Sequence, residues 1–178
     1  LGQFVSLTKN QRQDEYGGSL ENRGRIVVEI LQKIREKLGY VPLGVRLDIN
    51  RYVPGDYGVD EAIEYAKMFV QYADYISTDT GTWESIDMLV PSMNVPQGFL
   101  LPDVARIKQA IPGKVLIGNG RIVWPAMAEN ALEKGYMDMV GMARALIADP
   151  YWAKKAQEGR ADEIRGCIAC NQKCMGRL

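Results

Sequence analysis

The residues best suited to chemistry are three cysteines near the end of the chain, Cys167, Cys170 and Cys174. Their close spacing lets one loop present three thiolates to one centre, as an iron–sulfur cluster requires. Zinc would also accept thiolates, but the chain has no histidine that could complete its ligand set. An odd, clustered set is a poor disulfide framework. The pattern therefore favours a metal or redox site, and reduced thiols without a metal are the simpler alternative.

Two short segments combine small residues with an arginine, Gly118-Asn119-Gly120-Arg121 and Gly141-Met142-Ala143-Arg144. Small residues let backbone N–H groups approach a phosphate, and each arginine adds a charged, forked donor. A dinucleotide-binding fingerprint does not fit, because Val123 stands where a third glycine belongs. These segments therefore predict a phosphate site, with two glycine turns carrying surface arginines as the alternative.

Composition narrows the possible functions. The 178-residue chain has no histidine, which excludes Ser-His-Asp and Cys-His nucleophile systems. Its formal net charge is +0, so nothing attracts it to nucleic acid or to an anionic membrane. No apolar run approaches the roughly 18 residues of a membrane helix. No charged-then-apolar leader opens the chain, so we expect a cytoplasmic protein.

Hydrophobic periodicity predicts the elements that must position these residues. Apolar residues at a spacing of four, from Ile26 to Leu38, predict a helix over residues 20–38 that begins after Ser19. Further helices are expected from Asp60, from Pro102, over 126–134 and over 150–157. Short apolar runs predict strands at 41–47, 74–77, 114–117 and 137–142. The irregular stretch 78–101 is long enough to be a functional loop.

Strands that alternate with helices predict an α/β fold with a parallel sheet. Four such units fit half of a TIM (β/α)8 barrel, since a whole barrel needs about 250 residues. Right-handed crossovers would place the carboxyl ends of all strands at one rim. Arg46, the loop after Ser77 and the two glycine–arginine segments are expected to meet there.

Two more residues are candidates on this rim. Arg46 is a cation at the mouth of a barrel, so it needs an acceptor: the pyrimidine edge of a flavin would serve, and Asp48 or another carboxylate is the alternative. Trp83 lies in the long loop with Glu84 and could cover a ligand, although structural packing is the simpler role.

Taken together, these motifs resemble a known family. Asp14 to Arg23 is similar to the D-E-Y-G-G-S-x-E-N-R signature of the Old Yellow Enzyme family of FMN oxidoreductases. Gly44-Val45-Arg46-Leu47 and the two glycine–arginine segments follow in the family's order. The cysteine segment resembles the iron–sulfur branch, which holds 2,4-dienoyl-CoA reductase, 2-enoate reductase and relatives of trimethylamine dehydrogenase. The three residues before Cys174 match the reductases better than the amine dehydrogenases.

The resemblance implies a fold and a set of binding residues. Residues 1–163 would form the C-terminal half of an FMN-binding TIM barrel, and residues 164–178 would begin an iron–sulfur segment. Arg46 would contact the flavin ring, and Gly120, Arg121, Ala143 and Arg144 would hold the FMN phosphate. The three cysteines would ligate a [4Fe-4S] cluster whose fourth cysteine lies beyond Leu178.

The same resemblance implies an activity. Electrons from NAD(P)H, passed on by FAD in a further C-terminal domain, would reduce an activated C=C bond of a small-molecule substrate. The catalytic residues are not assigned, because the family's proton-donor tyrosine belongs to the first half of the barrel. Trp83 stands where the reductases carry a substrate-facing histidine, which argues against dienoyl-CoA as the substrate.

Other functions and assemblies stay open at this point. An amine dehydrogenase or N-demethylase on the same scaffold is one alternative, and a half-barrel that binds phosphate without catalysis is another. A half-barrel exposes strand edges, so the chain should need its other half or pair with a second copy as a homo-oligomer.

Overall fold

A computed structural model describes residues 1–176 of the chain. Its centre is a four-stranded parallel sheet in which the strands follow one another in sequence order. The strands are β1 (Gly44–Asp48), β2 (Tyr75–Asp79), β3 (Val115–Gly118) and β4 (Met139–Val140). Sequential, parallel neighbours are the arrangement of consecutive units in a (β/α)8 barrel.

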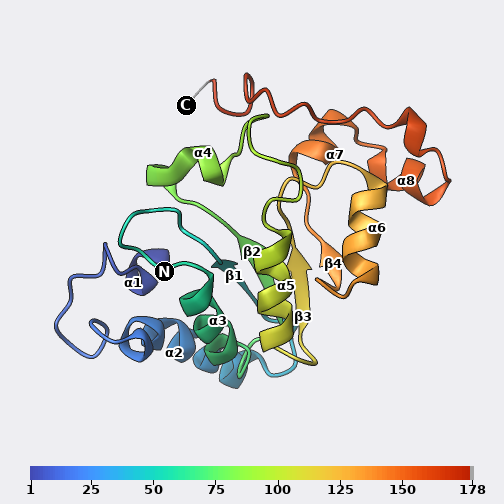
Figure 1. Cartoon of the computed structure of the whole chain (residues 1–178). Helices are drawn as coiled ribbons and strands as arrows, with labels where there is room; N and C mark the ends of the chain where they lie inside the picture. Colours follow the sequence, from blue (N-terminus) through green and yellow to red (C-terminus); the bar gives the residue numbers. More distant parts are fainter. Residues whose placement is uncertain (177–178) are drawn as a thin grey trace.

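Helices connect the strands and cover one face of the sheet. The crossovers are α3 (Val59–Phe69), α5 (Leu101–Ala110) and α6 (Pro125–Glu133), and α2 (Leu20–Leu38) precedes β1. In Figure 1, α3 and α5 lie side by side, and α2 packs against α3. Fully buried Ile76 and Leu116 on the strands meet a helical layer that includes Tyr65 and Phe69. The long connections therefore form the outer layer of the barrel half.

The helix over residues 20–38 is confirmed to its ends. The hydroxyl of Ser19 accepts a hydrogen bond from the backbone N–H of Asn22 at 3.3 Å, which caps the helix. Gly39 ends it with a φ of 60°, a conformation that glycine adopts at little cost.

An aspartate can cap a helix, but Asp60 does not cap the helix that is expected from it. Helix α3 begins one residue earlier, with Gly58 as its N-cap. Asp60 instead lies in the first turn, where its carboxylate pairs with Arg106 on α5. A carboxylate is favourable both at the N-cap and in the first turn of a helix. The residue type alone therefore does not distinguish these two positions.

Other differences lie at element ends and in short helices. β1 and β2 end later than expected, and β4 keeps only two residues of the expected 137–142. The expected 150–157 helix begins later, as α8 (Trp152–Gln157). The long loop contains two short pieces, η1 (Trp83–Ser85) and α4 (Ile86–Leu89). Sequence patterns missed α1 (Gly2–Val5), α7 (Arg144–Ala148) and η2 (Ala161–Glu163), because such short turns have no clear periodicity.

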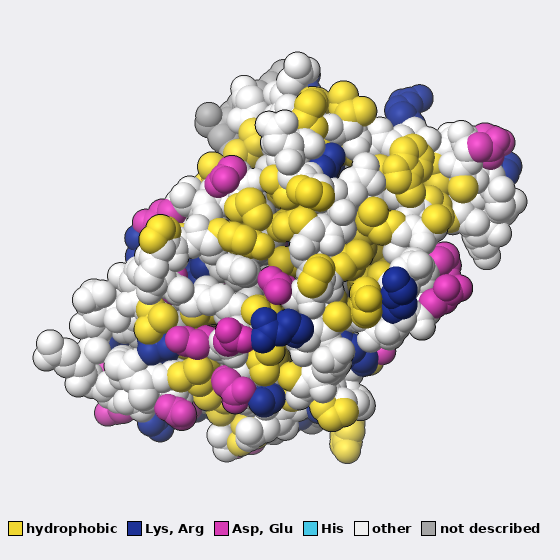
Figure 2. Space-filling view, viewed as in Figure 1, with side chains coloured by type: hydrophobic (Ala, Val, Ile, Leu, Met, Phe, Trp, Pro, Cys, Tyr) yellow, Lys and Arg dark blue, Asp and Glu magenta, His cyan; other side chains and the backbone are white. Residues whose placement is uncertain are grey.

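Polar and apolar surfaces are unevenly distributed. Figure 2 shows hydrophobic side chains gathered across the middle of one face, with charged side chains around them. Within residues 1–176, no helix combines the length and the apolar character needed to cross a lipid bilayer.

Candidate functional site

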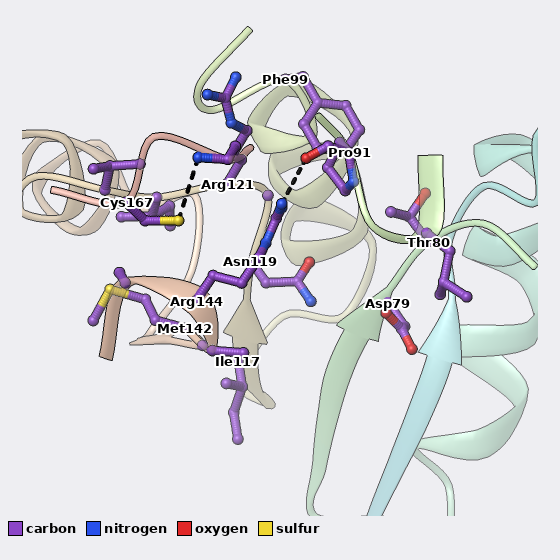
Figure 3. A pocket seen from close by; sticks show the side chains of 18 of the residues that line it. Asp79, Thr80, Pro91, Phe99, Ile117, Asn119, Arg121, Met142, Arg144 and Cys167 are labelled. Carbon is purple, nitrogen blue, oxygen red and sulfur yellow. Dashed lines mark hydrogen bonds between the residues drawn. The ribbon is translucent and has the colours of Figure 1, made fainter. Parts of the chain in front are cut away.

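The carboxyl ends of the four strands surround one cavity of about 320 Å³ (Figure 3). This volume lies within the usual range for small-molecule sites. Its wall includes six residues singled out from the sequence: Arg46, Gly120, Arg121, Ala143, Arg144 and Cys167. The topology therefore brings the first five of these residues together at one rim, as expected from parallel strands, and Cys167 joins them from the cysteine segment.

Hydrogen bonds between strand ends fix the floor of this cavity. The backbone N–H of Asn119 donates to Thr78 Oγ1 at 3.2 Å, and its side-chain amide donates to the Thr78 carbonyl at 2.8 Å. Farther along, the N–H of Gly141 donates to the Gly118 carbonyl at 2.7 Å. The loops after β2, β3 and β4 are thus held in a fixed relation.

The loop after β3 has an unusual backbone. Arg121 has a φ of 62°, which is uncommon for a residue with a side chain. The preceding Gly120 has a φ of 135°, and a Cβ there would lie 2.7 Å from the Cβ of Leu100. Such strain costs on the order of 1 kcal/mol and often marks functional sites. The left-handed backbone at Arg121 places its side chain along the cavity wall.

The guanidinium of Arg121 lacks a complete set of acceptors. Its Nη1 donates to the carbonyl of Val95, while its buried Nε has no hydrogen-bond partner within residues 1–176. Burial, together with the nearby charge of Arg144, lowers the pKa of the Arg121 guanidinium. A buried donor with no acceptor is costly. Two adjacent cations with an unmet donor fit an anionic group such as a phosphate.

Arg144 ties the far side of the cavity to two other segments. Its Nη1 donates to the Pro91 carbonyl and to Asn171 Oδ1, both at 2.7 Å. Within residues 1–176, this guanidinium forms hydrogen bonds only through Nη1. Its remaining donors are therefore available to a ligand in the cavity.

Arg46 lines the opposite side of the cavity and has a carboxylate partner. Its Nε donates to Asp79 Oδ2 at 2.6 Å, while 68% of its side chain is exposed. The pairing raises the pKa of Arg46. The carboxylate alternative is thus realised, although with Asp79 and not with Asp48. The exposed guanidinium still faces the cavity, where it could also meet a flavin.

Asp48 lies opposite Asp79 in the sheet register and is largely buried. Burial, and then the charge of Asp79, raises the pKa of Asp48 to about 6. The folded protein therefore binds this proton more tightly than the unfolded chain does. The protonated form of Asp48 therefore stabilises the fold. This contribution to the free energy of unfolding is fully present below about pH 4 and is lost as the pH rises through about 6.

Asp48→Asn should stabilise the whole protein at pH 8 by about 1–2 kcal/mol, because it removes a buried charge and keeps an acceptor for Arg51. The advantage should vanish well below the unfolded-state pKa of 3.8, where Asp48 is protonated in both states. Melting temperatures of both proteins across this range check the prediction. A difference that is constant with pH would contradict it.

Asp149 provides a control for which the pH dependence of stability has the opposite direction. A hydrogen bond from Lys155, strengthened by the backbone N–H of Arg165, lowers the pKa of Asp149 to about 2. Stability from this carboxylate is present above about pH 4 and is lost as the pH falls through 2. Asp149→Asn should therefore be the less stable protein at pH 7, and the gap should narrow in acid.

The structure places one of the three cysteines at the cavity. Cys167 lines the cavity and accepts a hydrogen bond from the N–H of Ala169 at 3.4 Å, whereas Cys170 and Cys174 are exposed. Within residues 1–176, no three Cys, Asp or Glu side chains lie close enough to hold a metal ion. The cluster therefore stays a prediction.

The structure does not place Trp83 in the cavity. Its side chain lies in η1 and is 73% exposed, while Thr80 and Leu89 from the same loop form the wall. Sequence reasoning also missed Asp79, Asn119 and Asn171. The first two could have been found, because each directly ends or follows a strand on the carboxyl side of the sheet.

Comparison with known proteins identifies similar chains. Residues 1–163 match the model of the NADH:flavin oxidoreductase / NADH oxidase family. The chain is 38% identical to the NADH oxidase of Thermoanaerobacter brockii over 178 residues, which is 99% of this chain and 27% of that protein. The chain thus spans about a quarter of this relative's length.

Solved structures agree with the fold. A 2-naphthoyl-CoA reductase in complex with 2-naphthoyl-CoA matches 96% of this chain with a TM-score of 0.89 and 37% identity, and the match covers 26% of that protein. The histamine dehydrogenase of Rhizobium sp. 4-9 matches 96% of the chain with a TM-score of 0.85 and 33% identity, over 24% of its own length.

Proposed function

Because this chain belongs to the NADH:flavin oxidoreductase / NADH oxidase family, we propose that residues 1–163 are the C-terminal half of an FMN-binding TIM barrel. Residues 164–178 then begin an iron–sulfur segment of the same enzyme. The proposed protein transfers electrons from NAD(P)H to a small-molecule substrate, with FAD in a further domain as an additional carrier.

The observation that carries this proposal is the pair of arginines at the rim. Within residues 1–176, Arg121 presents a buried Nε without a partner, and Arg144 beside it keeps donors that form no hydrogen bond. With the small residues Gly120 and Ala143 on the same wall, they form a cradle for the FMN phosphate. Bound FMN supplies hydride transfer, which no side chain of this chain provides.

Arg46 and Asp79 have a complementary role on the other side. We assign Arg46 to the pyrimidine edge of the flavin, where negative charge increases on reduction. Asp79 orients Arg46 through the 2.6 Å hydrogen bond and reduces its net charge. The two residues together would set how strongly this chain favours the reduced flavin.

The cysteine segment offers the kind of ligand that an iron–sulfur cluster needs. Cys167, Cys170 and Cys174 supply three thiolates for a [4Fe-4S] cluster. The N–H···S bond to Cys167 is of the kind that tunes such clusters. Because Cys167 also lines the cavity, a cluster bound there would lie next to the flavin site.

The rest of the barrel is the expected partner of the open side of the sheet. Val115 on β3 and Met139 on β4 are 40% and 54% exposed, although they are strand residues. Exposed apolar strand residues favour a covering partner. The other half of the same barrel fits this surface, and a second copy of the chain is the alternative.

Reduction of an activated C=C bond is the reaction we favour. Similarity to a 2-naphthoyl-CoA reductase supports a conjugated acyl substrate, and the cysteine spacing resembles the reductases. The test is anaerobic oxidation of NADH or NADPH by the whole protein in the presence of conjugated enoates and enoyl thioesters. We expect stoichiometric formation of the saturated product.

Two outcomes would overturn this assignment. Similarity to a histamine dehydrogenase gives the amine alternative a specific prediction: amines, and not alkenes, would reduce the bound flavin. A whole protein that binds phosphate ligands but neither FMN nor iron would instead be a non-catalytic half-barrel module.

A further inference from the structure

Asn171 lies between Cys170 and Cys174 and uses both ends of its side-chain amide. Its Oδ1 accepts from Arg144 Nη1 at 2.7 Å, and its Nδ2 donates to the Val90 carbonyl at 2.7 Å. These partners are 27 and 81 residues away in the sequence. One amide therefore joins the cysteine segment to Arg144, which lines the cavity, and to Val90, which lies between the lining residues Leu89 and Pro91.

The backbone at Asn171 has a left-handed conformation, which the side-chain hydrogen bonds help to hold. Its φ is 57°, and Ala169 two residues earlier has a φ of 54°. Residues with side chains rarely adopt this left-handed conformation, although asparagine tolerates it better than most. The Asn171 carbonyl also accepts from the N–H of Met175 at 2.8 Å, which closes the turn that holds Cys174.

The hydrogen bonds of Asn171 close a ring of contacts with Arg144, Pro91 and Val90. Arg144 Nη1 donates at once to Asn171 and to Pro91, and Asn171 donates to Val90, the neighbour of Pro91. Movement of the Arg144 guanidinium therefore moves the cysteine turn, unless one of these bonds breaks. Arg144 is also a wall residue of the proposed phosphate cradle.

We propose that Asn171 is a positioning residue that couples binding of FMN to binding of iron by the cysteines. This inference rests on the proposed function. A phosphate that holds Arg144 also holds Asn171, and so orders the turn between Cys170 and Cys174. Because coupling between two sites is reciprocal, iron on the cysteines must strengthen FMN binding by the same factor.

The experiment uses the whole protein stripped of FMN and iron. The dissociation constant for FMN is measured by flavin fluorescence, before and after loading with ferrous iron and sulfide. Iron and sulfide retained per chain are measured with and without FMN. In the wild type we expect iron loading to tighten FMN binding about tenfold, since a hydrogen bond to a charged group contributes at this scale.

Asn171→Gly removes both side-chain bonds while accepting the left-handed backbone. In this variant, iron loading should tighten FMN binding less than twofold, although FMN and iron each still bind. Asn171→Asp keeps an acceptor, now negatively charged, for Arg144 and loses the donor to Val90. It should therefore retain more of the coupling than Asn171→Gly. Gln172→Gly, at an exposed neighbour, adds the same backbone freedom and should behave as the wild type.

Two results would overturn the inference. The coupling role fails if the wild type binds FMN equally well with and without iron, or if Asn171→Gly keeps the tenfold effect. A wild type that binds neither FMN nor iron would instead remove the proposed function, and the coupling with it.

Discussion

Replacing Arg121 by methionine should raise the dissociation constant for FMN by about 100-fold. The substitution removes a charged donor whose Nε is buried and has no partner within residues 1–176. A hydrogen bond to a charged group is worth about 1.5–3 kcal/mol, which is a factor of roughly 10 to 150 in affinity. Methionine fills a similar length, so the cavity wall is preserved.

The measurement is a fluorescence titration of the FMN-free whole protein. Arg106→Met is the matched control, because Arg106 lies on the exposed face of α5 and pairs with Asp60, away from the cavity. It should leave FMN affinity unchanged. If Arg121→Met also binds FMN as tightly as the wild type, the phosphate is not held at this rim.

Replacing Cys167 by serine should lower the iron content of the whole protein at least tenfold. Serine is nearly the same size but is a poor ligand for iron in a cluster. Cys167 is also the one cysteine that lines the cavity within the described chain, so its loss should slow flavin–cluster electron transfer in any cluster that remains.

Iron and acid-labile sulfide assays, with the visible spectrum, check this result. Lys173→Ala, an exposed neighbour in the same segment, is the control and should keep the iron of the wild type. The same assays separate the earlier alternatives. One zinc per chain without visible absorbance indicates a zinc site, and no metal at all indicates reduced thiols. Wild-type iron in Cys167→Ser would contradict the ligand assignment.

Much of the fold could be predicted from local patterns. The apolar spacing over residues 20–38 fixes one helix, and the strand–helix alternation leads to a parallel sheet whose carboxyl ends meet. That rule alone was enough to place Arg46, Arg121 and Arg144 around one cavity. Family similarity then extends the sheet to part of a TIM barrel.

The contacts that complete the site could not be predicted. Arg121 and Arg144 bind backbone carbonyls of Val95 and Pro91, and carbonyls occur at every residue, so no sequence pattern marks these two. Arg46 had several carboxylates in reach by sequence, and only the strand register selects Asp79. The role of Asn171 depends on its left-handed backbone, which tertiary contacts impose.

We propose that this chain belongs to an enzyme that holds FMN and an iron–sulfur cluster at one rim of the sheet. The most direct measurement is an anaerobic ultraviolet–visible spectrum of the whole protein before and after dithionite. We expect flavin bands over a broad iron–sulfur background, with both bleached on reduction. A featureless spectrum that FMN, iron and sulfide cannot restore would contradict the account.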